Sequence, residues 1–406
     1  MRKSFALLLF IMYTLGAVAQ FGRLYMGDQY LMSSIASKVI QDHYGRIWIG
    51  TRNGVCMYNG YRFHNFKKES HGDLGLNSNY INEVSQDRQG NIYLGSSEGV
   101  QVLRGDHFHS VRLMEGSKKE IKGYVKRIYQ TSTGETLIAV SGHGVYKMVN
   151  DTTAQVWDKQ LRVANFVTDI FEDRSKRIWL LTSNKGVWMR ENGKWAKCQL
   201  PDDSQGPFVN ICQDHDGTLY LANLGGGLYR SRKGNPQQLE CVPGTKHLPL
   251  NTVTISQMGF LLLGTDGVGV FRYLPQSQQV EQVNLYCREV DINRAKIMSI
   301  MEDREGNLWL GLFQKGVFMQ PRPQFGFQYM GAKSPTHDLI GEACVMATRY
   351  GKDGTLYVST DKDGLYAINP DGTLKRHYTP GKGAQAVPFT ILGITEDTQG
   401  RLWIGT

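Results

Sequence analysis

The chain has 406 residues, of which 41% are hydrophobic, 20% charged and 11% aromatic, and its formal net charge is +9. This composition excludes a disordered or collagen-like protein, and the length exceeds the roughly 100–200 residues of one ordinary domain, so we expect several domains or one large repetitive architecture. The 46 glycines against 12 prolines, with 20 tyrosines and 16 phenylalanines, favour many strands joined by tight turns.

The first nineteen residues have the three-part layout of a secretory signal: Arg2-Lys3, an apolar run over Phe5–Leu15, and the small-residue close Ala17–Ala19. A membrane anchor is the alternative, but the run is too short to span about 30 Å comfortably. We therefore predict a signal peptide over residues 1–19, a mature chain from Gln20, and a periplasmic location. Removal of the two positive charges lowers the net charge from +9 to +7. Export makes nucleic acid an unexpected partner.

One unit recurs along the mature chain: an apolar strand, a polar turn that usually ends in glycine, a second strand centred on an aromatic residue, and a short loop into Gly-Val or Gly-Leu. The central positions of the second strands are Trp48, Tyr93, Ile138, Trp179, Tyr220, Leu262, Trp309, Tyr357 and Trp403, spaced 41 to 48 residues apart. A third strand and a looser fourth strand follow in each unit. Four short strands per period of about 40–45 residues predict the blades of a β-propeller.

A longer echo sets the number of blades. The segment that begins at Phe21 returns at Phe325–Gly331, an offset of 304 residues that contains seven central positions, from Trp48 to Trp309. The fold class is therefore predicted as all-β, with a seven-bladed propeller over residues 20–323 whose last blade takes Phe21–Met26 as its outer strand. Residues 324–406 are predicted to be the first blades of a second, truncated propeller, and we expect the chain to be the front part of a longer protein.

The six cysteines are Cys56, Cys198, Cys212, Cys241, Cys287 and Cys344. An exported chain permits disulfides, but none of the six forms a Cys-x-x-Cys pair, and a disulfide framework belongs to much smaller domains. Cys56, Cys212 and Cys344 lie in apolar, strand-like runs, where a free cysteine behaves as a small buried hydrophobe. We expect most of the cysteines to be free.

Candidate catalytic and metal-binding residues fail on closer inspection. One aspartate precedes the turn of the repeat in six units, where its side chain can accept backbone N–H bonds, so we assign it to the blade: Asp42, Asp87, Asp173, Asp214, Asp303 and Asp397. His107 and His109 have no third ligand nearby, so exposed histidines are favoured over a zinc site. We predict no catalytic residues, no metal and no cofactor.

Function is then expected in residues that break the repeat. In a four-stranded antiparallel blade, the loop between strands two and three shares a face with the loop that enters the next blade's first strand. These loops converge on the mouth of the central channel, where concave propeller sites form. From the first class we select as ligand-binding candidates Arg52, Asn53, Glu98, His143, Lys185, Asn223, Asp266 and Gln314. The second class holds Asn79, Tyr124, Asn165, Phe208, Asn251 and Arg294. The alternative for any one of them is a solvated loop residue.

The repeated pattern Asp-x-x-Gly-x-Ile/Leu-Trp-Ile/Leu-Gly-Thr resembles the two-component regulator propeller repeat. Its place after a secretory signal resembles the periplasmic sensor of hybrid two-component systems from polysaccharide-degrading gut bacteria. The resemblance implies a full-length receptor in the inner membrane that can form a homodimer and whose histidine kinase lies beyond Thr406. It implies that this chain is no enzyme and senses an oligosaccharide.

Two function classes stay open. A ligand-sensing domain predicts no catalytic constellation and a chain that continues. A free-standing, secreted propeller lyase or hydrolase acting on glycans predicts non-repeated acid–base residues around the channel. The sequence favours the sensor.

Overall fold

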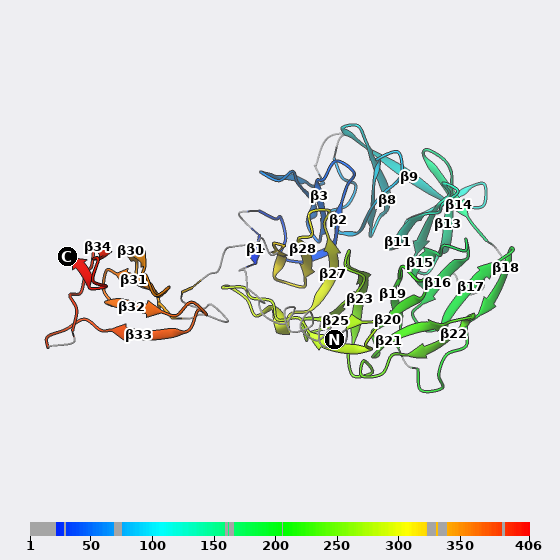
Figure 1. Cartoon of the computed structure of the whole chain (residues 1–406). Coiled ribbons are helices and arrows are strands. Elements are labelled where there is room, and N and C mark those ends of the chain that lie inside the picture. Colours follow the sequence, from blue (N-terminus) through cyan, green and yellow to red (C-terminus); the bar gives the residue numbers. More distant parts are fainter. Residues whose placement is uncertain are drawn as a thin grey trace. The chain divides into compact units, whose positions relative to one another are not determined.

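The structure, a computed structural model, describes residues 22–27, 30–68, 75–158, 161, 166–204, 206–322, 330–331, 339–383 and 386–406 (Figure 1). The predicted signal peptide, residues 1–19, and most of the second echo copy, Phe325–Gly331, lie outside these ranges. Contacts divide the chain into two units, one within Phe21–Arg322 and one within Pro323–Thr406.

The first repeat shows how each blade forms. Strands β2 (Ala36–Gln41), β3 (Ile47–Thr51), β4 (Gly54–Tyr58) and β5 (Phe63–Phe66) pair antiparallel in chain order. Strand β3 is buried along its whole length, as expected for a strand packed between neighbouring blades. Gly45, with φ of 86°, allows the tight turn from β2 to β3.

The turn aspartate ties this hairpin together. Asp42 Oδ1 accepts hydrogen bonds from the backbone N–H groups of Tyr44 and Arg46, both at 2.9 Å. Its Oδ2 accepts from Arg46 Nε at 2.6 Å and from Trp48 Nε1 at 2.8 Å. The aspartate of the repeat is therefore a structural residue, as the sequence predicts.

Six further groups of four strands repeat this pattern among the described residues of the unit within Phe21–Arg322. Their bounds are β6 Ile81–Gln86, β7 Ile92–Ser96, β8 Gly99–Arg104 and β9 His107–Glu115; β11 Val125–Gln130, β12 Thr136–Val140, β13 Gly144–Asn150 and β14 Thr153–Val156; β15 Val167–Glu172, β16 Ile178–Thr182, β17 Val187–Glu191 and β18 Lys194–Lys197; β19 Phe208–Gln213, β20 Leu219–Asn223, β21 Leu228–Arg232 and β22 Asn235–Cys241; β23 Leu250–Ile255, β24 Leu261–Thr265, β25 Val270–Leu274 and β26 Gln279–Gln282; β27 Ile297–Glu302, β28 Leu308–Leu312, β29 Gly316–Gln320 and β1 Arg23–Tyr25. A short β10 (Lys119–Ile121) pairs with β9, and parallel pairing of β14 with β9 joins two groups into one nine-stranded sheet.

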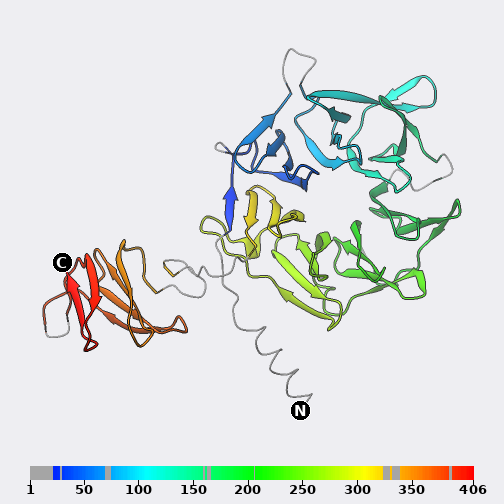
Figure 2. The same ribbon diagram turned by 45° about the horizontal axis from the view of Figure 1, so that its top comes forward.

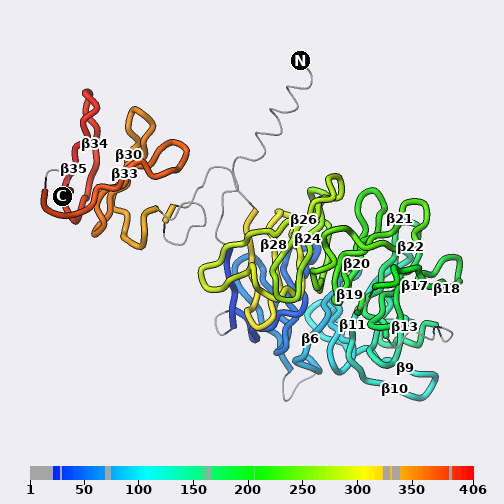
Figure 3. The backbone as a smooth tube through the Cα atoms, turned by 90° about the horizontal axis from the view of Figure 1, so that it is seen from below, coloured from blue at the N-terminus to red at the C-terminus, as the bar shows by residue number. Residues whose placement is uncertain are grey.

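These groups form a closed ring. Each first strand packs beside the first strand of the next group, and β27 packs beside β2. Figure 2 and Figure 3 show the groups following one another in chain order, from blue through green to yellow. The seven groups agree with the blade number that the echo predicts, and we refer to this unit as the ring.

The last blade is completed by the beginning of the described chain. Strand β1 pairs antiparallel with β29, in the register Arg23 with Met319 and Tyr25 with Val317. The ring of Tyr25 stacks on that of Trp309, with centroids 5.9 Å apart and planes 10° apart. The outer-strand pairing predicted for Phe21–Met26 is therefore present over Arg23–Tyr25.

The second unit repeats the hairpin pattern. Strands β30 (Val345–Tyr350), β31 (Leu356–Thr360), β32 (Leu365–Ile368) and β33 (Leu374–Tyr378) form one sheet, and β34 (Gly393–Glu396) pairs with β35 (Leu402–Gly405). The prediction of an all-β fold with a propeller and the start of another is confirmed. No helix of the described residues is long and apolar enough to cross a membrane.

All six cysteines are free. The expectation that Cys344 is buried is wrong, because this residue is exposed. It precedes β30 instead of lying within it, and its carbonyl accepts a hydrogen bond from the N–H of Asp361, the residue that follows β31. Cys56 and Cys198 are buried, as expected for small apolar side chains in blades.

Candidate functional site

One end of the ring is organised by a repeated backbone contact. In every blade, the residue after the second strand donates its N–H to the carbonyl of the residue just before the first strand. The pairs are Arg52 with Ile35, Ser97 with Tyr80, Ser141 with Tyr124, Ser183 with Phe166, Leu224 with Pro207, Asp266 with Pro249 and Phe313 with Lys296, at 2.8 to 3.4 Å. Both loop classes of the sequence prediction therefore lie on one face, which we call the channel mouth.

The side chains at the channel mouth are unevenly distributed. The guanidinium of Arg52 lies 4.9 Å from the ring centroid of Tyr80 and 5.9 Å from that of Phe313. The rings of Tyr80 and Tyr124 are 6.1 Å apart, and Lys126 Nζ lies 4.5 Å from the Tyr124 centroid. We call Phe313, Arg52, Tyr80, Tyr124 and Lys126 the aromatic arc. It presents apolar ring faces beside cationic N–H donors.

Below the arc, the central channel holds a cavity of about 140 Å³. Its lining takes the second and third residues of each first strand: Ser37 and Lys38, Asn82 and Glu83, Lys126 and Arg127, Thr168 and Asp169, Val209 and Asn210, Asn251 and Thr252, Met298 and Ser299. A register shift in each first strand falls at its second residue. Such a bulge redirects side chains, which explains how two consecutive residues can face the same channel.

The third residues of these strands interlock around the channel. Arg127 lies 3.0 Å from Glu83 Oε1 and 2.9 Å from Asp169 Oδ1, and Lys38 lies 3.9 Å from Glu83. Asp169 Oδ2 in turn accepts from Asn210 Nδ2 at 2.9 Å. Burial disfavours the charged form of Arg127, but attraction to Asp169 and Glu83 outweighs it and raises the pKa of the guanidinium.

The same network continues through uncharged groups. Asn210 Oδ1 accepts from Thr252 Oγ1 at 3.1 Å, and Ser299 Oγ accepts from the Val39 N–H at 3.1 Å, which links the last blade to the first. We call Lys38, Glu83, Arg127, Asp169, Asn210, Thr252 and Ser299 the channel belt. Because its two carboxylates serve inter-blade contacts, the belt is a structural device beneath the mouth.

The predicted site residues differ in the contacts that their side chains make. Arg52 belongs to the aromatic arc. Glu98 Oε2 lies 3.4 Å from Lys122 Nζ, and Asp266 Oδ1 lies 2.6 Å from Lys296 Nζ, so both carboxylates are already paired. Lys185 Nζ lies 5.3 Å from the ring centroid of Phe166.

The remaining predicted residues lie on the same loops. Asn53 donates from Nδ2 to the Met32 carbonyl at 3.1 Å, and His143 and Gln314 are exposed. The expectation that Asn223 contacts a ligand is corrected by its position. Its side chain is fully buried, and its Oδ1 accepts a hydrogen bond from the Gly225 N–H at 2.7 Å. It occupies the strand-end position that Thr51 holds in the first blade, so it shapes its own loop and is inaccessible to a ligand.

Among the residues expected before the first strands, Tyr124 belongs to the arc, Asn251 lines the cavity and Phe208 is buried. Asn165 lies outside the described residues. Sequence reasoning missed Tyr80, Lys126 and the channel belt. It placed Phe313 in the same loop class as Gln314 but did not select it as a candidate. The belt residues could not be recognised because the bulge that turns them into the channel has no sequence signature. Tyr80 could have been found by aligning the position before each first strand among the repeats.

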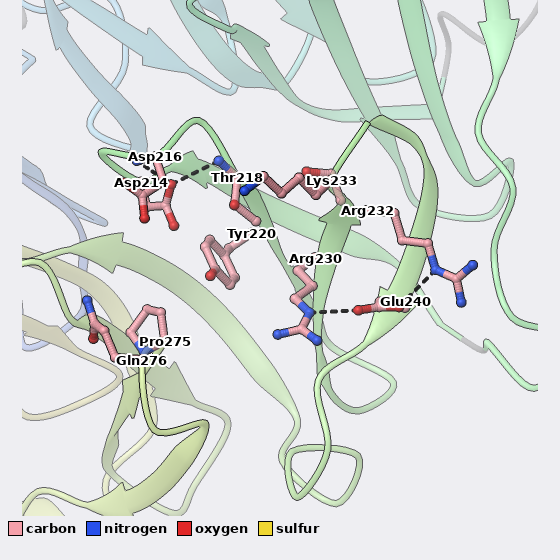
Figure 4. Close-up of a pocket in the computed structure, with 11 residues that line it drawn as sticks. Asp214, Asp216, Thr218, Tyr220, Arg230, Arg232, Lys233, Glu240, Pro275 and Gln276 are labelled. Atoms are coloured by element: carbon pink, nitrogen blue, oxygen red, sulfur yellow. Dashed lines mark hydrogen bonds and ion pairs between the residues drawn. The ribbon is translucent and has the colours of Figure 1, made fainter. Parts of the chain in front are cut away.

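A second cavity, of about 310 Å³, lies on the opposite side of blades five and six (Figure 4). Its charged side chains neutralise one another: Arg230 Nε lies 2.8 Å from Glu240 Oε1, and Arg232 Nε lies 3.0 Å from Glu240 Oε2. Asp214 accepts from the Thr218 N–H at 2.9 Å. Both arginines of this cavity are paired with one carboxylate, whereas Arg52 and Lys126 at the mouth lie over aromatic rings, so we take the mouth as the stronger candidate. No cluster of metal-ligating side chains occurs among the described residues.

Comparison with known proteins bears on the repeat. Residues 75–98 and 291–314 match the family described as two component regulator propeller. Two segments of the ring therefore match two-component regulator propeller repeats. Comparison with curated proteins gives no significant sequence match.

Solved structures share the fold. The extracellular domain assigned to the hybrid two-component system BT3049 of B. thetaiotaomicron is 16% identical, with a TM-score of 0.70 over 95% of this chain and 52% of that one. The corresponding domain of BT4673 is 19% identical, with a TM-score of 0.62 over 96% and 51%. A streptogramin B lyase is 13% identical, with a TM-score of 0.57 over 75% and 99%.

At these identities the similarity shows the fold. The chain spans about half the length of the two B. thetaiotaomicron domains, whereas the lyase is covered almost completely. The presence of a lyase on a related propeller means that function has to be argued from the site itself.

Proposed function

We propose that this chain is the ligand-sensing region of a periplasmic two-component receptor and that it binds an oligosaccharide at the channel mouth of the ring. The observation that carries the proposal is the aromatic arc above a polar cavity. Concave sites that combine ring faces with a few polar groups are the usual form of small-ligand sites. The two-component regulator propeller repeats and the extracellular neighbours support the sensing role.

The chemistry of the arc suits a sugar. Tyr80, Tyr124 and Phe313 are half-buried, so each is held in place while part of its surface stays accessible to the C–H face of a pyranose ring. Arg52 and Lys126 stand beside these rings and can donate to hydroxyl or carboxylate oxygens.

The rest of the receptor is part of the same proposal. Residues 1–19 support export, and the extracellular neighbours support a periplasmic position. Attachment to the inner membrane, dimerisation and kinase output would belong to other parts of a full-length receptor. In this scheme the chain itself cleaves no glycan.

Calorimetric titration of the chain against a panel of plant and host oligosaccharides tests the proposal. Tyr80→Ala and Tyr124→Ala should each weaken binding by about tenfold, since a ring contact contributes roughly 1–1.5 kcal/mol. Tyr61→Ala is the matched control, because Tyr61 is 80% exposed on the turn between β4 and β5. Binding that survives both arc variants would place the site elsewhere, and glycan cleavage would favour the lyase or hydrolase alternative.

A further inference from the structure

We infer that the ligand of the channel mouth is anionic, a saccharide that carries carboxylate or sulfate groups. This inference rests on the proposed function and narrows it to a ligand class. The loop sequences hold cations and carboxylates in mixture, which by itself points to no ligand charge. The structure separates the two kinds of charge by pairing.

The carboxylates near the mouth are occupied. Glu98 pairs with Lys122 at 3.4 Å and Asp266 pairs with Lys296 at 2.6 Å. Deeper in the channel, Arg127 contacts both Glu83 and Asp169, and Lys38 lies 3.9 Å from Glu83, so two cations balance two carboxylates. None of these four groups is left to repel an incoming anion without compensation.

Three cations at the mouth remain unneutralised. Arg52, Lys126 and Lys185 are exposed, and each lies over an aromatic ring, that of Tyr80, Tyr124 or Phe166. Each lacks an ion pair with any carboxylate of the described chain. An aromatic ring holds a cation in place without cancelling its charge, so these groups keep their attraction for an anion.

Lys126 is the sharpest case. Although its side chain is exposed at the mouth, the surrounding channel wall partly desolvates it and lowers the pKa of its ammonium group. A bound anion would restore the interactions that the ammonium loses there. This places a favourable anion position at the entrance of the cavity, next to the ring of Tyr124.

The cavity below also offers donors. Asn82 Nδ2 and Asn251 Nδ2 are buried, and neither has a hydrogen-bond partner in the described chain. Both residues line the cavity. A buried N–H group without a partner is costly, so the two amides favour a ligand rich in acceptor oxygens, which carboxylate and sulfate groups supply.

The test compares ligands that differ only in charge. The first pair is tetragalacturonic acid and its fully methyl-esterified form; the second is a sulfated galactan tetrasaccharide and its desulfated form. At least one acid should bind about tenfold more tightly than its neutral counterpart, with an affinity that falls as salt rises. The pair that shows the difference identifies the anion as carboxylate or sulfate.

Variants place the anion at the mouth. Lys126→Gln and Arg52→Gln should each weaken acid binding by about tenfold, because each removes a charge-assisted hydrogen bond to the anion, and should weaken binding of the neutral form by a clearly smaller factor. Arg62→Gln is the matched control, since Arg62 also covers a tyrosine ring, at 5.2 Å, but on the turn between β4 and β5. All three substituted side chains are exposed, and thermal melting verifies that the variants are folded.

The outcomes are distinct. Equal, salt-insensitive binding of acid and neutral forms would overturn the anionic ligand while the proposed sensing of saccharides stands. Acid binding that is indifferent to both Lys126→Gln and Arg52→Gln would also overturn the inference, because the anion would then lie elsewhere. If no member of either pair binds but a neutral oligosaccharide of the panel does, this inference fails and the saccharide proposal stands; if nothing in the panel binds either, both fail.

Discussion

The indole nitrogen of Trp48 lies 2.8 Å from Oδ2 of Asp42, and both side chains are buried. The same bond joins Trp179 to Asp173 at 2.8 Å, and it recurs in the last blade of the ring and in the second unit. One residue pair therefore fixes the hairpin turn and the tryptophan that fills the space between blades.

Loss of this aspartate should destabilise the ring. Asp173→Ala removes the acceptor of Trp179 Nε1, Arg177 Nε and two backbone N–H groups, so the free energy of unfolding should fall by about 3–5 kcal/mol. Asp216→Ala, at an exposed turn position, is the control and should change stability by less than about 0.5 kcal/mol. Urea denaturation followed by tryptophan fluorescence measures both. Equal midpoints for the two variants would contradict the structural role.

The equivalent aspartate of the first blade, Asp42, predicts that the protein loses stability in acid. Burial acts to raise the pKa of Asp42, but hydrogen bonds from Trp48 and Arg46 outweigh it and hold the pKa below its usual range. A lowered folded-state pKa adds stability above the unfolded pKa of about 3.9, and this stability is lost as pH falls further. The difference in melting temperature between wild type and Asp42→Asn should shrink from about pH 6 to about pH 3. A constant difference over that range would refute the linkage.

Removing one charge of the channel belt should destabilise the protein more than removing all three interacting charges. Arg127→Gln leaves Glu83 and Asp169 nearly buried without their cation, and should lower stability by about 3–5 kcal/mol. The triple variant Glu83→Gln, Arg127→Gln, Asp169→Asn removes all three charges and should recover part of that loss. Chemical denaturation of both proteins measures the difference. A triple variant less stable than Arg127→Gln would show that the charges are net stabilising.

Ring closure depends on β1. A chain that starts after Gly27 loses the pairing of β1 with β29 and the stacking of Tyr25 on Trp309. It should lose cooperative melting, because β29 becomes an unpaired edge and the blade core opens. A chain that starts at Phe21 is the control and should melt like the parent. If both chains melt alike, β1 does not close the ring in solution.

Cysteine reactivity should divide by burial. Burial raises the pKa of Cys56 to about 11 and that of Cys198 to about 12, so neither should react in the folded protein at about pH 8. Cys344 is exposed and should react fast, a phase that Cys344→Ser removes. Thiol labelling in denaturant without reductant should find all six cysteines. Mass-spectrometric recovery of stoichiometric disulfides would overturn this expectation.

The ring could be predicted from the sequence because its determinants are local and repeated. A turn aspartate such as Asp42 followed by a strand tryptophan such as Trp48 predicts a hairpin. The recurrence of the Phe21 segment at Phe325 predicts the closing strand. The site was harder to predict. Arg52 could be selected because it breaks the repeat. Tyr80 and Lys126 become candidates only through their contacts with Arg52 and Tyr124 in the folded ring.

Asn223 and the channel belt show the same limit. Asn223 breaks the pattern in residue type but keeps the hydrogen-bonding role of the position, so variability was mistaken for function. Arg127 looks like an ordinary strand residue until a bulge turns it toward Glu83 and Asp169 from the adjacent blades. Contacts between residues more than forty positions apart leave no trace in local patterns.

The parallel pairing of β14 with β9, in the register Thr153 with Arg112 and Gln155 with Met114, gives the ring one seam unlike the others. At other blade boundaries of the described chain, isolated backbone bonds cross, such as that from the Leu239 N–H to the Gln199 carbonyl at 2.9 Å, whereas here a ladder between two strands crosses from one blade to the next. Amide protons along this seam should exchange with solvent together, as one cooperative segment of eight main strands. If the ring opens by local unfolding, the opening should therefore begin away from this double blade, which would remain as the last intact piece of the circle.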